Sequence, residues 1–399
     1  RRGTVEDKNT VSDFQEIEQV RQTTIYATPL HTEWRNYKIN IIDTPGLDDF
    51  IGEIAATMRV VDTVATVINA QNGVEVGTEI IWEYVNRFGK PSLFVINQID
   101  HPKANFEAAY SSIVAIVGKN AVKIQYPFIV GNDICIIDVL KMKMYKFGKD
   151  GGKPEKLPIP DSQKAVADEL HNELVERAAE NDEELMELFF EKGTLSEDEM
   201  RQGIKKGMLN HELFPVFCVS ALKDMGTGRL MGFIDNVAPG AADLKPEQSL
   251  EGKDVVCLPT EPTALFVFKS FHEPSIGKIT FFKVKSGEVK VNDKLENSRT
   301  GDIEYINQLF IMDGKKRESV EKLSAGDIGA TIKLKDTETN DTLHAVGKKI
   351  TIRPITFPED RIQKVIEPAE KKDEEKLGEV LKKISSQDPT CQAKYSGEL

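Results

Sequence analysis

The sequence is poor in cysteine, has no long apolar run and carries no excess of positive charge. The four cysteines among 399 residues lie far apart and show no paired metal-ligand spacing, which argues against a disulfide framework or a zinc ribbon. No apolar run approaches the roughly 20 residues that a membrane-spanning helix needs. The net charge of −13 argues against a protein that coats nucleic acid nonspecifically. We therefore expect a cytoplasmic protein with no membrane partner.

The two ends of the chain also carry information. The sequence starts with "RRGTV" instead of methionine and stops at "KYSGEL", within a pattern that continues. It contains no stretch of the form Gly-x-x-x-x-Gly-Lys-Ser/Thr, the loop that cradles nucleotide phosphates. We expect an internal piece of a longer protein, and we expect this piece alone not to bind GTP usefully.

The first part of the chain, residues 1–240, alternates short apolar strands with amphipathic helices. Such alternation predicts a parallel β-sheet with helices on its faces, an α/β fold. Within it, residues of about 119–209 form an expected α+β insertion whose second half is helical and acidic. The acidic face is either simply solvated or a docking surface for a basic partner. The expected strands span residues 37–43, 63–70, 92–98 and 214–221.

The pattern changes after a Pro/Gly-punctuated linker at 241–254. Residues 255–358 alternate apolar and polar residues with period two, in short strands broken by Gly, Asp and Asn. This pattern predicts a small antiparallel β-barrel. Residues 359–399 read as a strand and then a helix, the truncated start of a third, α+β domain.

A candidate phosphate-sensing segment follows the strand at 37–43. Asp43, at the end of the strand, can hold a Mg²⁺ ion through water, and Gly46 lets its backbone N–H approach a γ-phosphate. Thr44 and Pro45 lie between them. Upstream, Thr24 lies in a polar stretch that can close over a γ-phosphate with its hydroxyl on the metal.

A candidate base-recognition site follows two later strands. Asp100 of "NQID" can accept hydrogen bonds from guanine N1–H and from the exocyclic amine together, a pair that adenine cannot offer. In "SALK", the backbone N–H of Ala221 can donate to guanine O6. The expected base site comprises Asn97, Gln98, Ile99, Asp100, Ser220, Ala221 and Leu222.

These motifs occur in the order that the translational GTPases use, and the chain resembles that family, most closely its elongation factor G group. "EIEQVRQTTI" is similar to the first switch, "INIIDTPGLDDF" to the second, and "NQID" and "VFCVSALKDMG" to the base motifs. "GKITFFKVKSGEV" resembles the barrel domain, and "EPAEKKDEEKLGEVLKKISSQDP" the start of the third. The resemblance implies a P-loop GTPase-type sheet that binds GTP or GDP with Mg²⁺. It further implies a monomer that acts on the ribosome through ribosomal RNA and proteins, with the acidic insertion as a contact for the stalk protein.

Two substitutions depart from the family pattern. Leu47 stands where the family is expected to carry a histidine that positions the attacking water, and a leucine can neither accept nor donate a hydrogen bond. Gln98 replaces a lysine whose stem would cover the guanine base. The resemblance thus implies a GTPase with Thr24, Gly46 and position 47 at its catalytic centre, and with weakened hydrolysis. The alternatives are a non-hydrolysing, GTP-dependent ribosome-binding factor, or a ribosome-protection or release-type GTPase.

Overall fold

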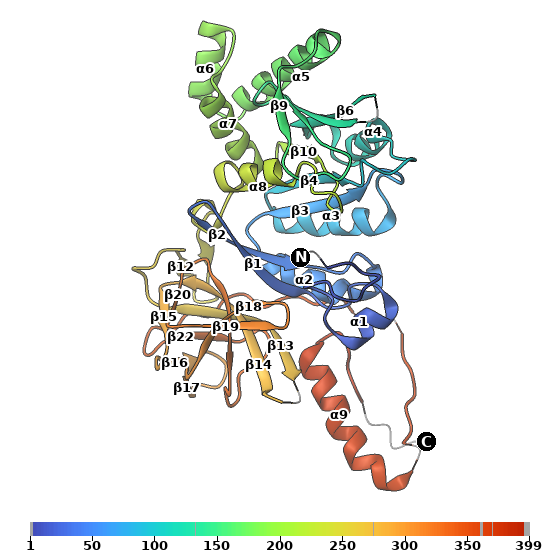
Figure 1. The fold of residues 1–399 in the computed structure, drawn as a ribbon. Helices are drawn as coiled ribbons and strands as arrows, with labels where there is room; N and C mark the ends of the chain where they lie inside the picture. The colour runs from blue at the N-terminus through green and yellow to red at the C-terminus, as the bar shows by residue number, and fades with distance from the viewer. Residues whose placement is uncertain (1–2, 132, 274, 360–361, 369, 395–399) are drawn as a thin grey trace. The chain divides into compact units, whose positions relative to one another are not determined.

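The computed structural model describes residues 3–131, 133–273, 275–359, 362–368 and 370–394 (Figure 1). The chain forms two compact units. The sheet unit is Asp62–Gly240, and the barrel unit combines Arg1–Val61 with Ala241–Leu399. Each unit is described separately below. No helix in the described part of the chain is long and apolar enough to cross a bilayer.

The sheet unit is built on a four-stranded sheet in the order β3-β4-β10-β5. All neighbours in it are parallel, which confirms the expected fold class. The central strand β4 is an apolar run buried almost throughout, as a strand covered on both faces requires. The outer edge of β3 pairs with no described strand, and Val67 on β3 is 61% exposed. The strands are β3 (Val64–Asn69), β4 (Ser92–Asn97), β5 (Ala121–Lys123) and β10 (Phe214–Cys218).

Helices and aromatic packing complete this core. Trp82 lies against Phe94 and Phe214, with ring centroids 5.4 Å and 4.8 Å away, so one indole joins a helix to two neighbouring strands. Such aromatic clusters supply much of the buried apolar area of a small core. The helices are α3 (Val76–Phe88), α4 (Phe106–Val117), η2 (Gly118–Asn120) and α8 (Thr227–Asn236).

The insertion lies between β5 and β10 and has its own antiparallel sheet, in the order β6-β7-β8-β9 (Figure 1). Three helices follow it, and a capping box of Ser196 with Glu199 opens the last of them. The elements are β6 (Gln125–Val130), β7 (Asp133–Asp138), β8 (Lys143–Lys146), β9 (Glu155–Leu157), α5 (Asp161–Ala179), α6 (Glu183–Lys192) and α7 (Glu197–Leu209).

The barrel unit begins with α1 (Glu16–Arg21) and a hairpin of β1 (Thr28–Trp34) and β2 (Tyr37–Asp43). The strand expected at 37–43 is therefore present, but its partner differs from the sequence-based expectation. It pairs antiparallel with β1, in a two-stranded sheet of its own, and not within the parallel sheet. β1 was not predicted, because "TPLHTEW" carries a proline and lacks regular alternation of apolar residues.

The expected β-barrel is an eight-stranded antiparallel sheet in the order β17-β16-β22-β13-β14-β21-β18-β19. Its inward residues, among them Leu265, Val267 and Phe282, form one buried cluster. The strands are β13 (Ala264–Glu273), β14 (Gly277–Ser286), β16 (Lys294–Asn297), β17 (Ile303–Tyr305), β18 (Leu309–Asp313), β19 (Lys316–Val320), β21 (Ile328–Ile332) and β22 (Thr342–Ala345), with the pairs β11 (Glu247–Gln248) with β12 (Asp254–Val255) and β15 (Glu288–Lys290) with β20 (Lys322–Ser324) alongside.

The remaining elements of this unit are helical. η1 (Asp48–Phe50) and α2 (Ile51–Val60) follow the candidate phosphate-sensing segment. η3 (Ala241–Asp243) lies in the linker, and η4 (Lys371–Asp373) precedes α9 (Glu374–Gln387). α9 contacts β13, where Ser386 Oγ lies 3.2 Å from Nε2 of His272. Part of the expected third domain, at 360–361, 369 and 395–399, falls outside the described residues.

Candidate functional site

The candidate base loops lie together at one edge of the parallel sheet. β4 ends at Asn97 and β10 at Cys218, and the two strands are neighbours that run in the same direction, so their following loops meet. The Asn97 side-chain oxygen accepts from the backbone N–H groups of Gln98 at 2.8 Å and Ala221 at 3.0 Å. The N–H of Ile99 donates to the Val219 carbonyl at 3.3 Å. Asn97 thus braces both loops.

Asp100 is held ready to act as a hydrogen-bond acceptor. Partial burial acts to raise its pKa, but hydrogen bonds from Ser220 and Lys223, with the nearby lysine charge, outweigh it and lower the pKa below the usual value. The ammonium of Lys223 lies 3.2 Å from Asp100 Oδ2. Lys223 was not among the predicted site residues. The signal that could have found it is its position directly after the Ser220–Leu222 motif.

Gln98 adopts an unusual backbone conformation, with φ of +63°. Its side-chain oxygen accepts from Nε2 of Gln71 at 2.8 Å, so a second glutamine, from the loop after β3, fixes its direction. Leu222 is 73% exposed at the tip of the other loop. No pattern in the sequence pointed to Gln71.

In the barrel unit, the threonine proposed for γ-phosphate sensing is held by a nearby acid. The Thr24 hydroxyl donates to Asp13 Oδ1 at 2.8 Å. The turn that carries Thr24 is fixed by the fully buried Glu18 of α1, whose Oε1 accepts from the backbone N–H groups of Ile25 and Tyr26, both at 3.0 Å. Three backbone and side-chain anchors therefore set the position of Thr24.

Asp43 lies in the same neighbourhood. Burial raises its pKa and the carboxylate of Asp13 raises it further, while hydrogen bonds from Ser12 and from the backbone of Thr44 act in the opposite direction. Two carboxylates and the Thr24 hydroxyl offer only oxygen donors, the type that Mg²⁺ prefers. The described residues contain no group of three or more His, Cys, Asp or Glu that could hold a metal by itself. Oxygen donors of this kind suit Mg²⁺, and Thr24 and Asp43 are the residues that would hold it.

The segment after Asp43 is open where the expected chemistry needs space. Pro45 is buried, while Gly46 is exposed and no atom lies within 4 Å of the position where a Cβ would stand. The Leu47 side chain is 48% exposed. An apolar group therefore occupies the exposed place at which a water-positioning side chain was expected.

A buried ion pair links α2 and the chain after Thr24 to strand β13 of the barrel. The Lys269 ammonium, on β13, lies 2.6 Å from Glu53 Oε2 on α2 and 2.9 Å from the carbonyl oxygen of Ala27. The same Glu53 oxygen accepts from the Ala27 N–H at 2.7 Å. Since Ala27 follows Thr24 by three residues, one ion pair ties together α2, the chain after Thr24 and β13. No pattern in the sequence indicated this ion pair.

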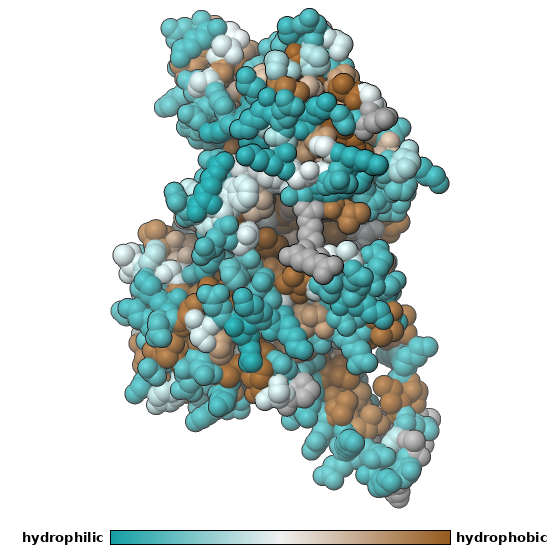
Figure 2. Space-filling model, viewed as in Figure 1, coloured by the Kyte–Doolittle hydropathy of each residue, from teal (hydrophilic) through white to brown (hydrophobic). Residues whose placement is uncertain are grey.

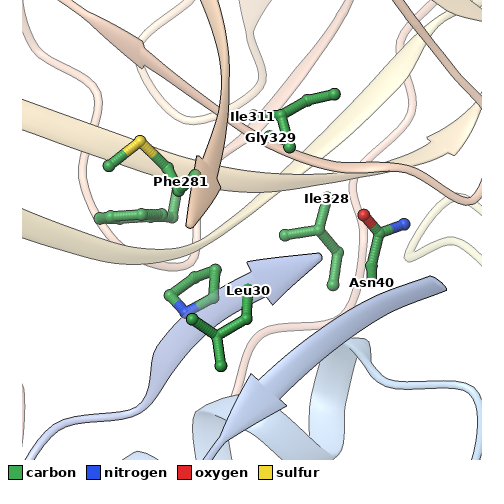
Figure 3. Close-up of a pocket in the computed structure, with 8 residues that line it drawn as sticks. Leu30, Asn40, Phe281, Ile311, Ile328 and Gly329 are labelled. Carbon is green, nitrogen blue, oxygen red and sulfur yellow. The ribbon is translucent and has the colours of Figure 1, made fainter. Parts of the chain in front are cut away.

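The described surface also has a narrow crevice at the seam between the β1–β2 hairpin and the barrel (Figure 3). In Figure 3, Leu30 and Asn40 come from the hairpin, and Phe281, Ile311 and Ile328 come from the barrel. None of the residues predicted for nucleotide binding lines it. Its lining is mostly apolar and includes no charged side chain, so we assign it no chemistry.

Comparison with known proteins gives matches to two family models and to solved structures. Residues 1–240 match the family described as the elongation factor Tu GTP binding domain, and residues 277–344 match elongation factor Tu domain 2. The crystal structure of ttk003000868 from Thermus thermophilus superposes on the whole chain with a TM-score of 0.89 and 23% sequence identity. The chain spans 58% of the length of that structure.

Proposed function

The chain belongs to the family of the elongation factor Tu GTP binding domain, and on that premise we propose that it is the guanine-nucleotide-binding part of an elongation factor G-like GTPase that drives movement of tRNA and mRNA on the ribosome. The observation that carries the proposal is the geometry of the base loops. Asn97 bonds the Ala221 N–H across two neighbouring strand ends, and Asp100 is held as a carboxylate beside them. The Asp100 carboxylate so placed complements the two N–H donors of guanine, whereas the Ala221 N–H would reach guanine O6 only by giving up its bond to Asn97.

The cofactors that we propose are GTP or GDP with Mg²⁺. Thr24 and Asp43 would hold the metal, which supplies charge neutralisation between the phosphates when bound. Gly46 would offer its N–H to the γ-phosphate. Leu47 has no group that can orient water, so we propose that hydrolysis is slow.

A second candidate function is that of a non-hydrolysing factor that uses GTP as a conformational ligand on the ribosome. The exposed Leu47 favours this alternative, because binding alone shifts a conformational equilibrium when one state holds GTP better. A ribosome-protection or release-type GTPase shares the same site, so this chain does not separate it from the first proposal.

We propose that the partners are ribosomal RNA and ribosomal proteins, and that the protein acts as a cytoplasmic monomer. Where Figure 2 shows the helices of the insertion, at the top of the view, their surface is mostly hydrophilic. The first turn of α7 alone carries Glu197, Asp198 and Glu199, and the first turn of α6 carries Glu183 and Glu184. This acidic surface is our candidate contact for the stalk protein of the ribosome.

The proposal is tested by phosphate release from GTP in the full-length protein, with and without ribosomes. A GTPase of this type gives release that ribosomes stimulate, at a rate well below that of a housekeeping factor. Release that stays at the level of the buffer control, together with GTP-dependent ribosome binding, would replace the enzyme by the binding factor. If neither phosphate release nor ribosome binding depends on GTP, both candidate functions are wrong.

Base selectivity is tested separately, by two variants. Asp100→Asn should lose the preference for GTP over other nucleotides, because Asp100 makes the contact that distinguishes guanine. Gln98→Lys should tighten GTP and GDP alike by a few-fold, since a cation over an aromatic face contributes about 0.5–2 kcal/mol. Isothermal titration with GTP and ATP measures the first effect, and titration with GTP and GDP measures the second. If Gln98→Lys changed the affinity for GTP alone, residue 98 would not lie beside the base.

A further inference from the structure

A loop of the insertion lies directly on the backbone of the base-recognition loop. Residues 148–152 connect β8 to β9, and the N–H of Gly152 donates to the carbonyl oxygen of Lys223 at 3.1 Å. A Cβ built on Gly151 would lie 1.6 Å from that oxygen and 2.6 Å from the carbonyl carbon. Because both atoms belong to the backbone, no rotation of a side chain could relieve the overlap. Only a glycine fits at position 151.

The insertion makes a second contact at the other end of the base-recognition loop, where α8 begins. Asp138, at the end of β7, has no exposed surface, and its Oδ2 accepts from Nε and Nη2 of Arg229 at 2.9 Å and 2.8 Å. Arg229 lies in the first turn of α8, directly after the loop, and its N–H bonds the Gly226 carbonyl at 3.0 Å. The insertion therefore holds the chain at both Lys223 and Arg229.

Lys223 is also bonded to residues of the two base loops. The backbone N–H of Lys223 donates to Ser220 Oγ at 3.3 Å, and its ammonium reaches Asp100. Ser220 and Met225 exchange backbone hydrogen bonds, both at 3.0 Å, which closes the loop on itself. A displacement of the Lys223 carbonyl by the insertion thus moves the side chain that pairs with Asp100.

We propose that Gly151 and Gly152 of the insertion are positioning residues for guanine recognition, which set the backbone of Lys223 and through it the carboxylate of Asp100. The inference rests on the proposed function, because it assigns these residues to the same base site. The insertion then helps to shape the nucleotide site, in addition to presenting its outer surface to a partner. The role needs no contact between the insertion and the nucleotide.

The test compares Gly151→Ala with Gly148→Ala in the full-length protein. Gly148 belongs to the same loop and has nothing within 4 Å of its Cβ position, so it is a matched control. Fluorescent GDP and IDP analogues are titrated into each variant, because inosine lacks the exocyclic amine that Asp100 would bind. We expect Gly151→Ala to weaken GDP binding by about tenfold and IDP binding by much less, since a misplaced carboxylate loses the contact that only guanine offers. Gly148→Ala should match the unmodified protein in both affinities.

Hydrogen exchange of the Ser220 and Met225 amides provides a readout that needs no nucleotide. It should be faster in Gly151→Ala than in Gly148→Ala, because the loop loses its support. If Gly151→Ala does not fold, Asp138→Asn, which keeps the side-chain volume, is measured in the same way. An unchanged ratio of GDP to IDP affinity in a folded variant would overturn the inference while leaving the proposed function intact. If the unmodified protein binds no guanine nucleotide, the proposed function is wrong, and so is this inference, which rests on it.

Discussion

At the residue scale, the proposed rate of GTP hydrolysis depends on the side chain at position 47. Thr24, Asp43 and Gly46 keep the residue types that phosphate sensing needs, and Leu47 stands exposed directly after them. In the full-length protein, Leu47→His should raise ribosome-stimulated phosphate release by roughly tenfold or more, because a histidine can accept from the attacking water or stabilise the developing charge. GTP affinity should hardly change, since the substitution adds no contact to the ground state.

The matched control for this variant is Leu47→Phe, which introduces a ring of similar size without any group that can bond to water. Fast ribosome-dependent turnover with Leu47 in place would mean that the water is positioned by another group. No gain from the histidine would favour the binding factor over the enzyme.

Lys285 carries a pH dependence of stability. Only 14% of its side chain is exposed, and burial, with the charge of Arg59, lowers its pKa to about 8 despite the opposing effect of Glu247. Between that value and the ordinary lysine pKa near 10.5, the unfolded chain binds more protons than the folded one, so stability rises with pH across this window. Relative to Lys285→Met, the unmodified protein should gain roughly 2 kcal/mol between about pH 7.5 and about pH 10.

Urea unfolding of both proteins at the two pH values measures this difference. The comparison with Lys285→Met removes the contribution of the other groups that titrate in the same range. Parallel pH profiles would show that Lys285 keeps an ordinary pKa in the folded state.

At the scale of elements, the Glu53–Lys269 pair decides whether α2 and the hairpin stay on the barrel. Lys269→Met removes the cation and leaves Glu53, with 14% of its side chain exposed, without its partner charge. Breaking a buried pair costs about 3–5 kcal/mol, and the partial exposure of Glu53 places our expectation at roughly 2–3 kcal/mol. Urea unfolding monitors the loss, with Lys316→Met on the exposed side of β19 as the control.

A double variant separates the charge from the packing. Glu53→Gln combined with Lys269→Met leaves no unpaired buried charge, so it should recover part of the stability that the single variant loses. If Lys269→Met were no less stable than Lys316→Met, the ion pair would contribute nothing to the barrel unit.

Sequence patterns predicted individual elements better than their pairing. The apolar runs at 37–43, 63–70, 92–98 and 214–221 each contain a strand, because burial on a sheet selects Val, Ile and Phe. The antiparallel partner of β2 was missed, since the register of a hairpin whose strands lack alternation leaves little trace in the sequence. The antiparallel sheet of the insertion was not resolved into strands for the same reason.

In the candidate site too, residues within short motifs could be predicted, whereas residues that act through contacts distant in sequence could not. Asn97, Asp100 and Ala221 were predicted as base-site residues because base recognition needs fixed residue types in short motifs. Asp13 and Gln71 act through contacts between segments distant in sequence, 11 residues from Thr24 and 27 from Gln98, so no local motif contains them. Gly151 could not be found either, because its requirement comes from the backbone of a loop about 70 residues further along the chain.

At the scale of the whole molecule, we expect these 399 residues to bind guanine nucleotide weakly. They contain the proposed base-site residues Asn97, Asp100 and Ala221 and the proposed metal residue Asp43, but no Gly-x-x-x-x-Gly-Lys-Ser/Thr loop. The backbone cradle and the lysine of that loop supply most phosphate contacts in nucleotide sites of this type. Titration of this chain with mant-GTP should show no saturation at micromolar protein. Tight binding would mean that other residues of the chain hold the phosphates.

The outer edge of β3, which no described strand covers, has a consequence for any sample of this chain. A strand that presents N–H and C=O groups at an open edge, with an exposed valine between them, can add a strand from another molecule as readily as one from its own. Each molecule that docks there offers its own surface to the next, so growth of aggregates follows protein concentration and time more than temperature. We therefore expect the open edge of β3 to be one site at which copies of the purified chain associate.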